Sequence, residues 1–277
     1  MSMLFYQVIH LETEEALAES YAKRLFEAGS VGVEREGGRL KAYFSDTIPL
    51  PERLKSLASL LPEAEGFRGT TIGLSDLSPL PSSFEPFELA GGVEVFPSSR
   101  FTIAERDDPG KIFLRLGPVF GTGRHETTIL AAQCLWELDP PPLSLLDVGT
   151  GSGILALLAK KKGIEQVDAV EISSEALKNA RENFELNGEE IPIYENVNEI
   201  GKTYEAVVAN LLVPTILFLK ESFLRLLKPG GVLILSGITP AEEGEVKAAF
   251  SALTPAFRKE QSPWLAFALK TPKNISN

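Results

Sequence analysis

The chain has 277 residues and a net charge of −11, with 44% hydrophobic and 23% charged residues. This length fits two modest domains and a connector, and the composition is typical of globular proteins. No apolar run is long enough to span a membrane, the N-terminus lacks a signal-peptide pattern, and one cysteine cannot form an internal disulfide, so we expect a cytoplasmic protein. The acidic balance disfavours nucleic acid as a partner, because phosphate binding needs a basic face.

The first 77 residues alternate in the order strand, helix, strand, strand, helix, strand. Thr13 is expected to cap the first helix and Gly29 to end it, while Gly37-Gly38 indicates a hairpin between two strands. The order predicts a small α+β, ferredoxin-like βαββαβ domain over residues 1–77, a fold that supports binding as often as chemistry. The expected strands cover 4–11, 30–36, 39–45 and 67–74, and the helices cover 13–28 and a stretch that starts near Pro51.

Residues 78–118 differ in composition from the segments on either side. Several prolines and serines between 78 and 90 predict a stiff connector. Two short strands are expected after it, at 93–96 and 111–116, around a turn that contains Asp107-Asp108-Pro109-Gly110. We therefore assign residues 78–118 to a linker with a short β segment.

From residue 119 onward, strands alternate with helices. This alternation predicts a doubly wound, mostly parallel sheet, with the last two strands added as a hairpin. The expected strands are 143–148, 166–171, 191–195, 205–209, 232–236, 257–261 and 265–270, and the expected helices are 129–138, 154–162, 175–187, 215–228 and 241–253.

A glycine-rich loop, Asp147-Val148-Gly149-Thr150-Gly151-Ser152-Gly153, lies between an apolar strand and a helix. Glycines let a ligand approach the backbone, and N–H groups at the helix start favour a polar or anionic group. A dinucleotide fingerprint would have glycine or alanine at position 154, but the residue is Ile154. The loop therefore favours an amino acid with adenosine over a pyrophosphate. Asp147 either holds a cationic amino group or orders the loop.

Other polar residues are expected near the same edge of the sheet. Glu171, 22 residues after Gly149, could accept hydrogen bonds from both hydroxyls of a ribose. The alternative is an exposed acid that interacts favourably with the dipole of the following helix. The amide of Asn210 can both donate and accept, so it could position an amine or hold the amino acid end of the ligand. The alternative is an asparagine that only forms the loop. Thr128 suits a carboxylate, or else caps a helix. For His125 an ordering role in its loop is favoured over that of a base.

Several motifs together resemble the bacterial methyltransferases that act on ribosomal protein eleven of the large-subunit stalk base, the PrmA type. This resemblance implies a Rossmann-like class I methyltransferase domain at 119–277 with a seven-stranded sheet, S-adenosylmethionine as cofactor, and substrate recognition by the N-terminal domain. Glu171 stands where the family usually has aspartate, and the expected tryptophan of the linker is missing. The motifs are FGTGRHETT, DVGTGSGILALLA, VEISSEALKNARENFELNG, VVANLL and LSGI.

The resemblance implies N-methylation of lysine ε-amino groups, and of an N-terminal α-amine, on that ribosomal protein. A class I methyltransferase with another protein or small molecule as substrate, and a non-catalytic relative that only binds the cofactor, remain alternatives. Asn210 is the candidate for orienting the amine. No metal site, membrane contact or direct nucleic-acid binding is expected. The residues assigned to cofactor binding are Phe120, Thr122, Thr128, Gly149, Thr150, Gly151, Gly153, Glu171, Ile172 and Asn210.

Overall fold

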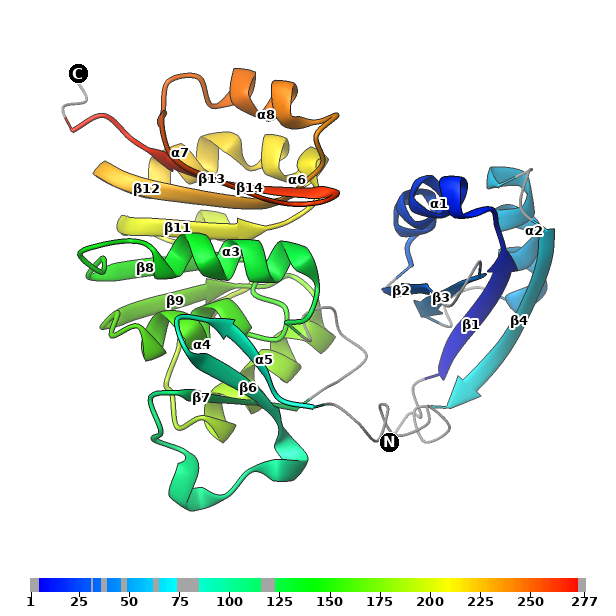
Figure 1. Cartoon of the computed structure of the whole chain (residues 1–277), viewed down its shortest axis with the longest axis horizontal. Coiled ribbons are helices and arrows are strands. Elements are labelled where there is room, and N and C mark those ends of the chain that lie inside the picture. Colours follow the sequence, from blue (N-terminus) through cyan, green and yellow to red (C-terminus); the bar gives the residue numbers. More distant parts are fainter. Residues whose placement is uncertain are drawn as a thin grey trace. The chain divides into compact units, whose positions relative to one another are not determined.

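The structure is a computed structural model, and the chain divides into two compact units, residues 1–84 and 85–277 (Figure 1). The described residues are 5–30, 32–35, 39–45, 49–61, 65–73, 85–115 and 123–273. The expected hairpin turn at Gly37-Gly38 and the assigned residues Phe120 and Thr122 therefore lie outside the described residues.

The first unit has the predicted order of strands and helices, and its sheet is antiparallel in the order β2-β3-β1-β4. Apolar residues alternate along β1 and β3 and recur every three or four residues along α1 and α2, so one sheet face and both helices share a core. This is the ferredoxin-like arrangement. The elements are β1 (Phe5–Glu12), α1 (Glu15–Glu27), β2 (Gly32–Arg35), β3 (Arg39–Ser45), α2 (Leu50–Leu60) and β4 (Glu65–Gly73).

The start of α1 differs from the prediction. The helix begins at Glu15, and the Glu14 carbonyl accepts the first bonds, from the N–H groups of Leu17 and Ala18. The hydroxyl of Thr13 donates to the same carbonyl at 3.2 Å, so Thr13 is not the expected cap. Gly29 ends the helix as expected, with a φ of 88° in the left-handed region.

The second unit opens with a three-stranded sheet of β5 (Phe87–Ala90), β6 (Val93–Pro97) and β7 (Lys111–Leu114). β5 pairs antiparallel with β6, and β6 pairs parallel with β7. The prediction of a connector was wrong for residues 87–90. β5 has only four residues between a proline and a glycine turn, and its place depends on pairing with β6 and packing against α3.

The main sheet has seven strands in the order β10-β9-β8-β11-β12-β14-β13, and only β14 runs in the direction opposite to the other strands. This confirms the predicted mostly parallel sheet with a terminal hairpin. Its strands are β8 (Ser144–Val148), β9 (Gln166–Val170), β10 (Ile193–Tyr194), β11 (Tyr204–Asn210), β12 (Leu227–Ile238), β13 (Thr254–Gln261) and β14 (Trp264–Lys270).

Helices cover both faces of this sheet (Figure 1). α3 packs against β11, β12 and β14, whereas α6, α7 and α8 share a core with the alternate strand residues, such as Val148, Ala209 and Leu235. The sheet is therefore doubly wound. The helices are α3 (Glu126–Trp136), α4 (Ile154–Lys161), α5 (Ser174–Leu186), α6 (Val213–Phe218), α7 (Lys220–Leu226) and α8 (Glu243–Ala249).

One predicted helix, 215–228, is two helices in the structure. α6 ends at Phe218 and α7 begins at Lys220, with Leu219 between them at a ψ of 1°. After this break Phe223 and Leu226 enter the core, while Phe218 is 85% exposed. Core packing of α7 accounts for the break, which apolar periodicity alone does not reveal.

Candidate cofactor-binding site

The predicted site residues Glu171, Asn210 and those of the loop 149–153 lie at the carboxyl edge of three neighbouring strands. β8 lies between β9 and β11, so the strand order changes direction beside it. The loop 149–153 follows β8, Glu171 follows β9, and Asn210 is the last residue of β11. Parallel strands bring these residues to one edge, the usual ligand position in doubly wound sheets.

The glycine-rich loop approaches neighbouring elements too closely for side chains at two of its positions. Gly149 has a φ of 75°, and a Cβ there would lie 2.5 Å from the side chain of Leu211. Gly153 has a φ of 85°, and a Cβ would lie 2.3 Å from the ring of Phe184. Both conformations favour glycine, and the loop is held against α5 and against Leu211, the residue after β11.

The sequence predicted that N–H groups at the start of the helix face a polar or anionic group, but four N–H groups of the preceding loop bond within the chain instead. Gly149 and Thr150 donate to the carbonyl of Val170 at 2.9 and 3.0 Å, and Gly153 donates to that of Thr150 at 2.8 Å. Gly151 donates to Oε2 of Glu171 at 3.0 Å. These four donors are therefore used within the chain and leave no nest for a phosphate.

Asp147 lies beneath this loop and is 1% exposed. Its Oδ2 accepts a hydrogen bond from the hydroxyl of Thr150 at 2.6 Å. Burial raises the pKa of Asp147 to about 7, because the charged form loses its hydration. Of the two interpretations, the geometry favours the role of ordering the loop.

Glu171 holds two backbone segments together and is 8% exposed. Besides the Gly151 bond, its Oε1 accepts from the N–H of Ser173 at 2.9 Å. A carboxylate offers about four lone-pair positions, so two hydroxyl donors can still be accepted. The cap of α5 is Ser173, whose hydroxyl accepts from Ala176, so Glu171 is not needed for that role. The neighbouring Ile172 is 86% exposed, an uncommon position for a large apolar side chain.

Asn210 and Thr128 come together from β11 and α3. Nδ2 of Asn210 donates to the hydroxyl of Thr128 at 3.2 Å, and the threonine is only 2% exposed. Neither Thr127 nor Thr128 caps α3. The cap is His125, whose Nδ1 accepts from the N–H of Thr127 at 3.3 Å, while burial lowers the pKa of the ring. His125 therefore has the ordering role that the sequence favoured.

The sequence also did not reveal the role of three asparagines on α5, which we call the asparagine ladder: Asn179, Asn183 and Asn187. They recur every four residues and are 8%, 0% and 2% exposed. Their amides bond to the backbone of residues 113–115, and one bonds to the glycine-rich loop. The available signal was asparagine at every fourth position along the buried face of the helix.

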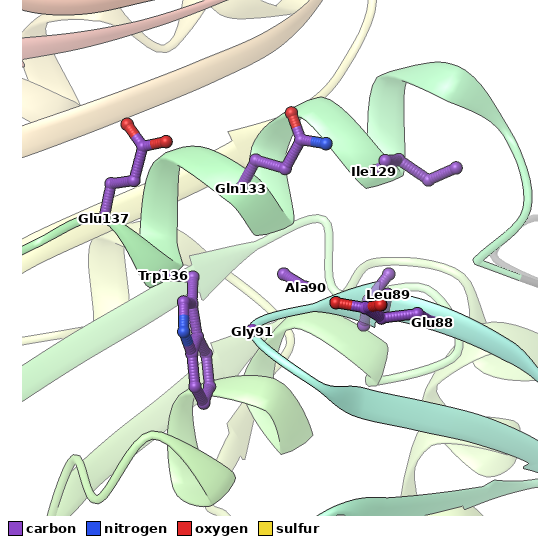
Figure 2. A pocket seen from close by; sticks show the side chains of 8 residues that line it. All are labelled: Glu88, Leu89, Ala90, Gly91, Ile129, Gln133, Trp136 and Glu137. Atoms are coloured by element: carbon purple, nitrogen blue, oxygen red, sulfur yellow. The ribbon is translucent and has the colours of Figure 1, made fainter.

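A separate hollow of about 390 Å³ lies between β5 and α3 (Figure 2). The indole of Trp136 covers Gly91, where a Cβ would lie 1.8 Å from the ring. Lys162 lies 5.1 Å from the centroid of that indole, and Glu137 forms a salt bridge with Lys259. Trp136 and Glu137 in the lining therefore already have partners within the chain. None of the assigned cofactor-binding residues that the structure describes lines the hollow. Its lining is Glu88, Leu89, Ala90, Gly91, Ile129, Gln133, Trp136 and Glu137.

The described part of the chain lacks the features of two other classes of site. There, no cluster of three or more histidine, cysteine, aspartate or glutamate side chains is arranged to hold a metal ion. Within the same residues, no helix combines the length and apolar character needed to cross a membrane.

Comparison with known proteins identifies the family. The family model described as ribosomal protein L11 methyltransferase (PrmA) matches residues 36–271. The chain belongs to this family. Among curated relatives, the ribosomal protein L11 methyltransferase of Trichlorobacter lovleyi is 30% identical, over 93% of this chain and 94% of its own length. The protein of the same name from Caldicellulosiruptor bescii is 32% identical, over 90% and 92%.

A solved structure agrees with this membership. The ribosomal protein L11 methylase from Lactobacillus delbrueckii subsp. bulgaricus has a TM-score of 0.61 and 28% identity, and the match covers 68% of this chain and 98% of that one. The chain is thus an S-adenosylmethionine-dependent methyltransferase with the class I fold. The predicted family, fold and cofactor are confirmed.

Proposed function

We propose that this enzyme methylates lysine ε-amino groups, and an N-terminal α-amine, of ribosomal protein L11. The proposal rests on membership of a family whose curated relatives are named ribosomal protein L11 methyltransferase. The observation that carries it within the structure is the convergence of Glu171, Asn210 and the glycine-rich loop at one edge of the sheet.

The residues of this edge fit S-adenosylmethionine better than a dinucleotide. Because four N–H groups of the loop bond within the chain, these four are not available to a pyrophosphate, whereas carbonyl oxygens of the loop can accept from a cationic amino group. Glu171 retains lone pairs for both ribose hydroxyls. Exposed Ile172 beside it provides an apolar surface for an adenine ring. When bound, the cofactor supplies an electrophilic methyl group on a sulfonium centre.

The remaining cofactor contacts come from the other assigned residues. We assign the amino acid end of the cofactor to the loop from Gly149 to Gly153 and to Thr128. Phe120 and Thr122 remain assigned from the sequence. Gly123, the first described residue after them, packs against Ile154 at the start of α4, where a Cβ at position 123 would lie 2.3 Å from Ile154 Cδ1. That contact places Gly123 beside the start of α4, which follows the glycine-rich loop.

Asn210 is the residue that we assign to the acceptor amine. A lysine amine has an ordinary pKa of about 10.4 and must lose its proton before it can act as a nucleophile. Partial desolvation in a closed pocket lowers that pKa. The hydrogen bond to Thr128 fixes the Asn210 amide, so its carbonyl oxygen can accept from the amine and orient it. Water accepts the released proton in this scheme.

The first unit is our candidate for recognising the protein substrate. We assign this role to residues 1–77, linked through 78–118 to the catalytic domain at 119–277. The fold of the first unit is a separate βαββαβ sheet with its own core, a common binding scaffold. The net charge of −11 favours a lysine-rich partner.

The test is methyl transfer from labelled S-adenosylmethionine to purified large-subunit ribosomal proteins. We expect label in L11, and we expect Asn210→Ala to lower kcat at least about tenfold, because orientation of the amine is lost. Binding of the cofactor, measured by calorimetry, should change less than kcat. Asn198→Ala, at an exposed asparagine of a short 3₁₀ turn, is the matched control. Absence of label from L11 would rule out this substrate, and wild-type turnover by the Asn210 variant would rule out its role.

A further inference from the structure

The asparagine ladder takes the place of a neighbouring strand for the end of β7. Oδ1 of Asn187 accepts from the N–H of Phe113 at 2.8 Å, and its Nδ2 donates to the carbonyl of Phe113 at 2.7 Å. Oδ1 of Asn183 accepts from the N–H of Arg115 at 2.7 Å, and Nδ2 of Asn179 donates to the Arg115 carbonyl at 3.1 Å. The amides thus pair with alternate residues of an extended segment.

The spacing of helix and strand makes this pairing possible. Four residues of an α-helix rise about 6 Å, and two residues of a strand rise about 6.6 Å. Asparagines four apart on α5 therefore stay in step with residues 113 and 115. The asparagine side chains thus fix the backbone of residues 113–115, and their buried amides are hydrogen-bonded.

Asn183 alone among the three also reaches the glycine-rich loop. Its Nδ2 donates to the carbonyl of Ser152 at 2.8 Å. The same peptide group donates through the N–H of Gly153 to the carbonyl of Thr150 at 2.8 Å. The peptide between Ser152 and Gly153 is therefore held from both sides at the start of α4, and one side chain links it to the end of β7.

We propose that Asn183 is a positioning residue for S-adenosylmethionine. It sets the orientation of the Ser152–Gly153 peptide and thereby the shape of the loop that receives the amino acid end of the cofactor. This role rests on the cofactor site assigned above. Asn187 bonds to β7 and to the backbone of its own helix, so its role is structural and it provides a matched comparison.

The first experiment compares Asn183→Ala with Asn187→Ala in the full-length protein. Each variant loses buried hydrogen bonds, so we expect similar decreases in Tm. We expect the Kd for S-adenosylmethionine, measured by calorimetry, to rise at least tenfold in the Asn183 variant and to stay within twofold of wild type in the Asn187 variant. An equal change of Kd in the two variants, or no change in either, would overturn the proposal.

The second experiment separates the Ser152 bond from folding. Asn183→Asp keeps the shape and the acceptor for Arg115, but an ionised carboxylate cannot donate to the Ser152 carbonyl, whereas a protonated one can. Relative to wild type at each pH, the affinity of this variant for the cofactor should recover as the pH falls. The stability of Asn187→Asp relative to wild type should also increase as the pH falls, but its affinity for the cofactor should not change. An affinity deficit of Asn183→Asp that is independent of pH would contradict the proposal.

Glu171→Ala distinguishes failure of this proposal from failure of the cofactor site. If that variant binds the cofactor as tightly as wild type, the assigned site itself is wrong. If Glu171→Ala loses affinity while Asn183→Ala retains it, the site stands and the positioning role of Asn183 is refuted.

Discussion

The two carboxylates of the cofactor edge differ in what surrounds them. Asp147 is 1% exposed beneath the loop and bonds to Thr150, whereas Glu171 is 8% exposed and accepts two backbone N–H groups. Burial disfavours the ionised form of Asp147, which also accepts from the backbone of Ala156 and so has its partners within the chain. We therefore expect Glu171 to contact the cofactor and Asp147 to order the loop.

Replacing Asp147 with asparagine should change how stability depends on pH. The pKa of Asp147 is raised in the folded protein, to about 7 from an ordinary 3.8, so the folded state retains a proton that the unfolded chain releases. Its contribution to the free energy of unfolding is full below about pH 4 and is lost as the pH rises through 7. Asparagine cannot ionise and can still accept from the Thr150 hydroxyl.

The stability of Asp147→Asn relative to wild type should therefore increase from pH 4 to pH 8, by up to about 4 kcal/mol. Urea unfolding at several pH values measures this difference, and Asp107→Asn at an exposed aspartate serves as the control. A difference between Asp147→Asn and wild type that does not vary with pH would show that Asp147 is ionised throughout.

At the scale of elements, close packing against α5 shapes the glycine-rich loop. Gly153 precedes the first residue of α4 and faces the ring of Phe184, next to Asn183 in the sequence. The loop conformation therefore depends on a helix that begins after the following strand. Three N–H groups of the loop turn toward the end of β9, because the Val170 carbonyl and Glu171 accept their hydrogen bonds.

Gly153→Ala should be more harmful than Gly163→Ala. Both glycines have left-handed φ values, 85° and 89°, so both substitutions cost about 1 kcal/mol of backbone strain. A Cβ at Gly163 meets nothing within 4 Å, whereas at Gly153 it overlaps Phe184. We expect a further loss of about 1–3 kcal/mol for Gly153→Ala and a weaker cofactor affinity. Equal loss in the two variants, measured by urea unfolding, would show that the Phe184 contact adjusts without cost.

At the scale of the whole molecule, each unit has a core and sheet of its own. The second unit, residues 85–277, contains every described residue of the cofactor site. The first unit contains none of them and has the strands, helices and core of an independent βαββαβ domain. Binding of cofactor and recognition of substrate are therefore separable in our proposal.

A fragment of residues 85–277 should fold and bind S-adenosylmethionine with a Kd close to that of the full chain. Its kcat/KM toward L11 should fall at least about tenfold, because contacts from the first unit are lost. Calorimetry and labelled methyl transfer measure the two quantities, with the full-length chain as reference. Undiminished transfer by the fragment would assign substrate recognition to the second unit.

The sequence by itself determined the order of most elements, the doubly wound sheet and the edge at which the candidate site lies. Apolar periodicity distinguishes strands from helices, and parallel strands must bring their carboxyl ends to one edge. Loop 149–153, Glu171 and Asn210 could be placed together for that reason. The motifs of the second half were sufficient to identify the family.

The tertiary structure alone decided how these residues are held. The strand β5, the break at Leu219, the inward N–H groups of the loop and the asparagine ladder all depend on partners distant in the sequence. The bonds of Asn183 span 68 residues to Arg115 and 31 residues to Ser152. Local propensity cannot predict such pairings, because a buried amide is stabilised only by the donors and acceptors that the folded chain brings to it.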